Sequence, residues 1–217
     1  MQRNPNQIAG LKKDFICQEI SVVDMKKIMT FLNGRLDILI MCHGRFEMST
    51  IDETNPEDFD SANFVNVRAT YNLLSMCSPF LRVTKGNCVA ISSQEAKIPV
   101  AGGLLNTVTK AMVNSLVENS ALELAPYGVR VNGVAPGVTN TKMRVGINDD
   151  FGTEENKRLL EGLGAYFPLQ KEVIQVDDIV DAILFLACDD AGFMTGEILT
   201  VDGGYSLNHD LCYNDEQ

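Results

Sequence analysis

The chain has 217 residues, of which 45% are hydrophobic and 22% charged, and its formal net charge is −11. This size and composition predict a single globular domain over residues 1–217. A surface this acidic disfavours nucleic acid and anionic membrane as partners. The sequence has no run of 18 apolar residues and no basic, apolar leader, so we expect neither a membrane span nor secretion.

The cysteines and histidines point away from disulfide and metal chemistry. The six cysteines form no C-x-x-C pair, and most of them lie in apolar runs. They are predicted to be reduced small hydrophobes in an intracellular, reducing compartment, which is the cytoplasm or an organelle such as the mitochondrion. The two histidines, His43 and His209, are too few and too far apart to predict a metal site.

The hydrophobic pattern predicts strands and helices that alternate along the chain. The strands are expected at 15–20, 36–42, 86–93, 129–135 and 197–204, and the helices at 22–32, 56–80, 104–124 and 176–188. The polar segment over about 140–170 receives no element. This alternation predicts an α/β fold with a doubly wound, mostly parallel sheet. Sheets of this kind bind ligands where their strands end, which directs attention to His43-Gly44, Ser92-Ser93 and Pro136-Gly137.

Short motifs follow one another near these strand ends. They are LDILIMCHG (36–44), Asn66 in FVNVRATYNLL, Ser93 in VAISS, Lys110 one helical turn after Asn106, PGVTNT (136–141) and TGEILTVDGG (195–204). In this order they resemble the short-chain dehydrogenase/reductase family, over about residues 3–206. The resemblance implies a Rossmann-like sheet, and it aligns Asn66, Ser93, Asn106 and Lys110 with the family's catalytic positions.

The resemblance also implies a chemistry. In the family a tyrosine passes a proton to or from the substrate oxygen while hydride moves to or from a nicotinamide. A lysine lowers the pKa of that tyrosine and holds the ribose, a serine bonds the substrate carbonyl, and an asparagine holds a water. The family positions that would bind the cofactor are Gly44, Lys110, Pro136, Gly137, Thr139 and Thr141.

Three features of the chain depart from the family pattern. Asn106 stands at the tyrosine position, and an amide cannot protonate a carbonyl near neutral pH. The Gly-x-x-x-Gly-x-Gly turn that cradles the pyrophosphate is absent, so the first βαβ unit of the sheet is expected to be missing. Bulky Met41-Cys42-His43 replaces the small residues beside the cofactor. His43 is expected to be structural, with a displaced acid–base role left open.

These departures favour a pseudoenzyme that does not transfer hydride, and we expect it to bind no cofactor. It would be retained as an interaction subunit or homo-oligomer through helices 56–80 and 104–125 and strand 197–204. The alternative is an NAD(P)-dependent oxidoreductase acting on a carbonyl or alcohol, whose cofactor segment lies upstream of Met1. A third hypothesis is a small-molecule binding module around Ser93, Asn106 and Lys110.

The missing unit has a consequence for the sheet. In the family the strand at 15–20 would be separated from strand 36–42 by the two strands that are absent here. We therefore expect residues 15–20 to pair in parallel with residues 36–41, with residues 22–34 as the crossover helix. Strands supplied by a partner chain are the alternative.

Overall fold

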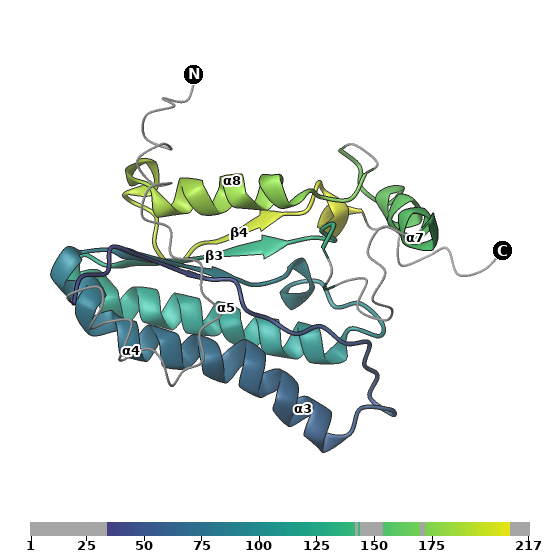
Figure 1. Ribbon diagram of the computed structural model, residues 1–217, viewed down its shortest axis with the longest axis horizontal. Coiled ribbons are helices and arrows are strands. Elements are labelled where there is room, and N and C mark those ends of the chain that lie inside the picture. The colour runs from purple at the N-terminus through teal and green to yellow at the C-terminus, as the bar shows by residue number, and fades with distance from the viewer. Residues whose placement is uncertain (1–33, 142, 144–153, 170–171, 209–217) are drawn as a thin grey trace.

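The described part of the chain contains one parallel sheet. The structure is a computed structural model, and it describes residues 34–141, 143, 154–169 and 172–208. The strands are β1 (Ile38–Met41), β2 (Asn87–Ile91), β3 (Arg130–Pro136) and β4 (Ile198–Val201). They pair in parallel in the order β1-β2-β3-β4 (Figure 1). The predicted α/β class and parallel sheet are confirmed.

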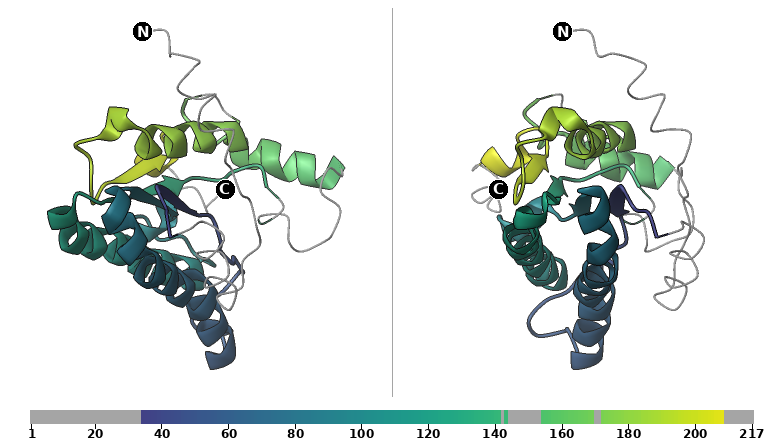
Figure 2. Two further views of the ribbon diagram at one scale, coloured as in Figure 1. Left: turned by 60° about the vertical axis from the view of Figure 1, so that its left-hand side comes forward. Right: turned by 90° about the vertical axis from the view of Figure 1, so that its left-hand side faces the viewer.

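Helices cover both faces of this sheet, as a doubly wound fold requires. Helices α4 (Ala69–Thr84) and α5 (Leu104–Leu124) lie on one face, and α8 (Val176–Ala187) lies on the other (Figure 2). Each face has its own core, with Val117 and Val131 on the α5 side and Val89 and Ile183 on the α8 side. Because β2 and β3 are buried against both layers, their sequences are apolar along most of their length rather than alternating.

The predicted helix 56–80 is one continuous helical segment with a π-helical turn inside it. Helix α3 (Pro56–Asn63) begins where expected, since the Asn55 side chain accepts a hydrogen bond from the Asp58 backbone at 2.8 Å. The π-helical turn η2 (Phe64–Arg68) follows, and α4 then continues to Thr84. π-helical turns often occur at functional sites, and Asn66 lies in this one.

Helix α5 has the predicted bounds, but the polar segment differs from its prediction. Residues 140–170 were left without an element, whereas α7 (Glu154–Gly164) lies inside them. This helix was missed although its few apolar residues recur at helical spacing, because the segment is short and mostly polar. The short helical turns are η3 (Gln94–Ala96), η4 (Ala125–Tyr127), η5 (Asp189–Ala191) and η6 (Tyr205–Leu207).

The predicted strand 15–20 and helix 22–32 lie outside the described residues. The proposed pairing of 15–20 with 36–41 is therefore not described, because one of its two segments lies outside them. Within the described ranges, β1 pairs only with β2. No helix in the described part of the chain is long and apolar enough to cross a membrane. The same part holds no group of three or more His, Cys, Asp or Glu side chains suited to a metal ion.

Candidate functional site

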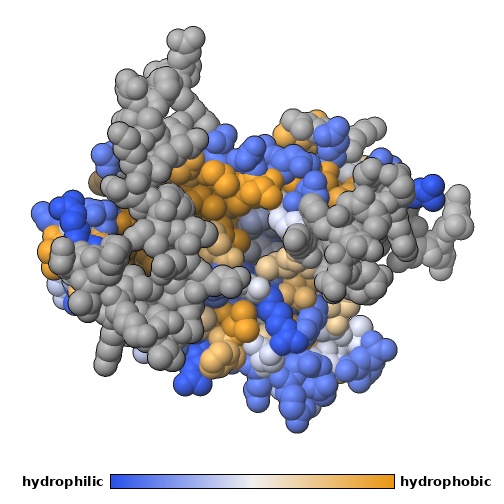
Figure 3. Space-filling model, in the orientation of Figure 1, coloured by the Kyte–Doolittle hydropathy of each residue, from blue (hydrophilic) through white to orange (hydrophobic). Residues whose placement is uncertain are grey.

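A cavity of about 350 Å³ lies where β1, β2 and β3 end. Figure 3 shows a hollow near the middle of the visible face, rimmed in part by hydrophobic side chains. Much of the wall is apolar, with Ile179 and Ile183 of α8 among its residues. Every predicted site residue except Asn66 lines this cavity, namely Gly44, Ser93, Asn106, Lys110, Pro136, Gly137, Thr139 and Thr141.

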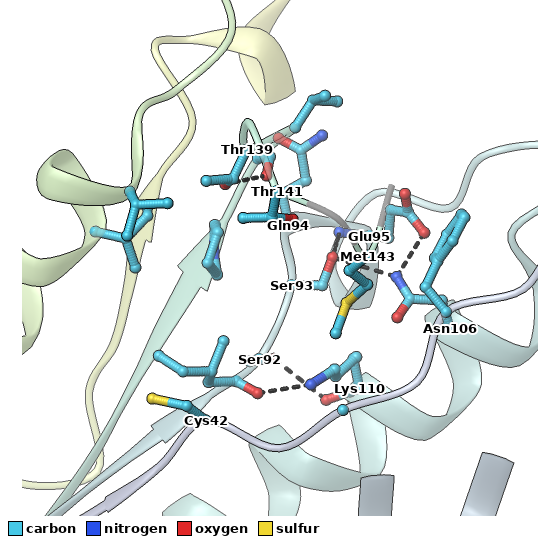
Figure 4. Close-up of a pocket in the computed structure, with 18 of the residues that line it drawn as sticks. Cys42, Ser92, Ser93, Gln94, Glu95, Asn106, Lys110, Thr139, Thr141 and Met143 are labelled. Carbon is cyan, nitrogen blue, oxygen red and sulfur yellow. Dashed lines mark hydrogen bonds between the residues drawn. The ribbon is translucent and has the colours of Figure 1, made fainter. Parts of the chain in front are cut away.

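Lys110 lies in the second turn of α5, and its side chain reaches the end of β2. Its Nζ donates a hydrogen bond to the Ile91 carbonyl at 2.7 Å (Figure 4). Burial lowers the pKa of Lys110 to about 8, and attraction to Cys42 opposes this shift. Among the described residues no carboxylate lies within ion-pair distance of it. The amine therefore holds its charge in an apolar setting with a carbonyl as its hydrogen-bond partner.

Asn66 does not line the cavity, but it holds the loop that does. Its Oδ1 accepts a hydrogen bond from the Arg45 backbone at 2.7 Å, and its Nδ2 donates to the Arg45 carbonyl at 3.0 Å. The same Nδ2 donates to Thr109 Oγ1 at 2.9 Å. The π-helical turn thus ties the loop after β1 to helix α5. This loop carries His43 and Gly44 into the cavity wall.

Asn106 lies beside Ser93 and a carboxylate that no motif predicts. Its Nδ2 donates to Glu95 Oε2 at 2.7 Å, and it also lies 3.4 Å from Ser93 Oγ (Figure 4). Ser93 Oγ also accepts a hydrogen bond from the Glu95 backbone at 3.2 Å, which caps the turn η3. Glu95 is 5% exposed, yet it lines the cavity. The amide at the tyrosine position therefore holds a buried carboxylate next to the serine.

His43 bridges two elements at the edge of the cavity. Its Nε2 lies 3.0 Å from Thr70 Oγ1 in α4. Burial, and then the charge of Lys110, lower the pKa of His43, so the ring is neutral at pH 7. His43 therefore has a structural role, because its hydrogen bond joins the loop after β1 to α4.

The nicotinamide end of a dinucleotide fits these residues. Gln94 is 5% exposed and lines the cavity, and its Oε1 has no hydrogen-bond partner. A buried amide oxygen without a partner is costly. It lies against Gly137, and a turn of the Gln94 side chain toward the cavity would let a ligand amide satisfy it. Lys110 and the hydroxyls of Thr139 and Thr141 line the same cavity. The described residues provide no Gly-x-x-x-Gly-x-Gly turn for a pyrophosphate.

Comparison with known proteins identifies the family. The profile described as "Enoyl-(Acyl carrier protein) reductase" matches residues 17–206. An "Uncharacterized oxidoreductase" of Thermotoga maritima is 33% identical over 191 residues, covering 87% of this chain and 74% of that protein. "Short-chain dehydrogenase reductase 3a" of Arabidopsis thaliana is 32% identical, covering 88% and 74%. The chain therefore belongs to the short-chain dehydrogenase/reductase family, a family of oxidoreductases.

Two further comparisons bear on chemistry and fold. The 2,3-dihydro-2,3-dihydroxybenzoate dehydrogenase of Escherichia coli K12 is 36% identical over 180 residues, covering 80% of this chain and 71% of that enzyme. The solved structure "ElxO with NADP Bound" superposes with a TM-score of 0.75 at 24% identity, covering 94% of this chain and 85% of that one. At this identity the second likeness bears on the fold alone, and it supports the Rossmann-like architecture.

Proposed function

We propose that this chain interconverts a small secondary alcohol and its ketone, with a nicotinamide as hydride acceptor and donor. The observation that carries the proposal is the cavity itself. It brings a serine hydroxyl (Ser93), a buried amine (Lys110), an unpaired amide oxygen (Gln94) and a carboxylate (Glu95) together between apolar walls. A cavity of about 350 Å³ suits a small ligand. The E. coli relative is named for a cyclic compound that carries alcohol groups.

The residues divide the work as follows. Lys110 and Gln94 would hold the ribose and the carboxamide, and Ser93 would orient the substrate oxygen. A nicotinamide bound there would supply the carbon that accepts or releases hydride. The apolar walls exclude water, which strengthens each of these polar contacts. Asn66 keeps the loop after β1 in place against α5.

The nicotinamide end should account for most of the cofactor affinity. We expect NADH and reduced nicotinamide mononucleotide to bind within about threefold of each other, each with a dissociation constant above about 100 μM. The reason is the missing phosphate turn, without which the adenosine diphosphate half gains few contacts. Isothermal titration calorimetry on the full chain measures both constants. Failure of both to bind would refute the proposal. NADH binding more than about 30-fold tighter than the mononucleotide would show a phosphate site elsewhere.

A second candidate function is that of a silent interaction subunit, which the amide at position 106 favours. The two long helical segments expose large apolar side chains, including Phe64 (57%), Tyr71 (56%) and Leu122 (77%). Such side chains suit a dimer formed through α4 and α5, where the sequence analysis places the partner surface.

Sedimentation velocity tests this surface. We expect the chain to sediment as a dimer and the Leu122→Glu variant to sediment as a monomer, because a buried unpaired carboxylate is costly at an interface. Phe193→Glu is the matched control, since Phe193 is fully exposed and lies outside α4 and α5. A monomeric parent chain, or a dimer that survives Leu122→Glu, would contradict this surface.

A further inference from the structure

The cavity contains an acidic side chain that the family motifs do not account for. Glu95 follows Ser93 by two residues on the turn η3, and its side chain is buried against the first turn of α5. Buried carboxylates are uncommon unless the protein provides for their charge. Two features of the structure do so here.

The first feature is the Asn106 amide. It donates to Glu95 Oε2 at 2.7 Å, a short distance for a hydrogen bond to a neutral donor. The second feature is the start of helix α5, whose positive end favours an anion. A Cβ atom on Gly103, the cap of α5, would lie 2.9 Å from Glu95 Oε2, so the carboxylate rests directly on this helix end. Glycine at 103 leaves the room for it.

Ser93 connects this carboxylate to the substrate position. The Asn106 amide lies between the Ser93 hydroxyl, at 3.4 Å, and the Glu95 carboxylate, at 2.7 Å. The amide thus links Ser93 to a carboxylate that lines the same cavity. In the family the proton acceptor is the phenol at position 106, and here the residue at 106 holds a different acceptor.

We propose that Glu95 is the proton acceptor and donor of this site, with Asn106 as its positioning residue. This inference rests on the proposed function. In the oxidation, the C–H bond of the alcohol carbon breaks, and its hydrogen leaves with both electrons to an oxidised nicotinamide. The O–H bond breaks, its proton forms an O–H bond on Glu95, and the carbon–oxygen double bond forms. Glu95 then releases the proton to water, and the reverse sequence reduces the ketone.

A cofactor-free measurement tests the contact. The full chain, labelled with ¹³C at its glutamate carboxyls, is titrated with cyclopentanol and followed by NMR. The Glu95 resonance is assigned by its absence from the Glu95→Gln variant. We expect this resonance to shift with added cyclopentanol, and to lose most of that shift in Asn106→Ala, where the carboxylate is no longer held. The Glu118 resonance is the control, because Glu118 is exposed on α5, the helix that carries Asn106, and should not move.

Turnover tests the proton transfer. We expect Glu95→Gln to slow cyclopentanol oxidation by about 100-fold or more with NAD⁺ or nicotinamide mononucleotide as oxidant, while KM changes little. Glu95→Asp should recover part of the rate, and Glu118→Gln should match the parent. Thermal unfolding of each variant separates misfolding from lost chemistry.

An unmoved Glu95 resonance, or an unchanged rate in Glu95→Gln, overturns the assignment of Glu95. If the Glu95 resonance moves but the parent chain does not turn over cyclopentanol, the proposed function and the proton transfer are both wrong. Glu95 would then only bind the hydroxyl of the alcohol.

Discussion

Gly86→Ala is expected to lower the free energy of unfolding by about 3 kcal/mol. Gly86 lies just before β2, where its backbone approaches the chain leading into β1. A Cβ atom at this position would lie 2.3 Å from the Asp37 carbonyl oxygen and 2.9 Å from its carbon. The obstructing atoms belong to the backbone, so no side-chain rotation relieves the contact. The two strands would have to separate at this end, at the expense of the 2.9 Å hydrogen bond from the Asn87 N–H to the Asp37 carbonyl.

Urea denaturation of the parent chain and the variant measures this loss. Gly162→Ala in α7 is the matched control, because nothing lies within 4 Å of a Cβ atom there. Alanine is the better residue inside a helix, so this control is expected to gain up to about 1 kcal/mol. A loss below about 1 kcal/mol in Gly86→Ala would mean that β1 and β2 are less closely joined than the structure has them.

Lys110→Met is expected to raise the free energy of unfolding at pH 7 by about 2 kcal/mol. Burial lowers the pKa of Lys110 to about 8, from an ordinary value of 10.5. Below pH 8 both the folded and the unfolded chain carry the charge, and the folded chain bears the full penalty of burying it, on the order of 3 kcal/mol. Loss of the hydrogen bond to the Ile91 carbonyl offsets about 1 kcal/mol of the gain.

The advantage of the variant should shrink as the pH rises. Between pH 8 and 10.5 the unfolded chain binds more protons at Lys110 than the folded chain, so the parent gains stability with pH while Lys110→Met does not. The buried Cys77 thiol, whose pKa burial raises to about 11, is common to both proteins and cancels in their difference. Lys97→Met, at an exposed lysine, should show no such dependence. Equal differences at pH 7 and pH 10 would rule out a buried charge at Lys110.

One of the three departures that favour a pseudoenzyme is the residue at position 106. The sequence pattern indicates that Asn106 replaces a proton donor, and its amide cannot serve as one. In the structure that amide contacts Glu95, which is a titratable group inside the same cavity. The substitution at 106 therefore need not remove proton transfer from the site, because Glu95 can supply it.

Much of the fold is predictable because its signals are local. Strand β3 is recognised from a short valine-rich run and helix α5 from its helical period, and their observed bounds lie within one residue of the prediction. The start at Asn55 is equally local, since a cap acts on the next three residues. Helix α7 was missed because it is short and mostly polar, although its few apolar residues recur at helical spacing. The π-helical turn at Asn66 was missed because its backbone differs from an α-helix without a change in hydrophobic pattern.

The family, the order of strands and helices, and the cavity positions Ser93, Asn106 and Lys110 follow from the sequence alone, because motif spacing and hydrophobic period depend on neighbours along the chain. What surrounds these positions depends on how the chain packs. Glu95 and Gln94 belong to no motif, and their role depends on how the turn η3 packs on the first turn of α5. The shifted pKa of Lys110 has the same origin, since burial is a property of the packed molecule. The pKa values and hydrogen-bond partners of these side chains depend on residues far away in the sequence, which packing brings next to them.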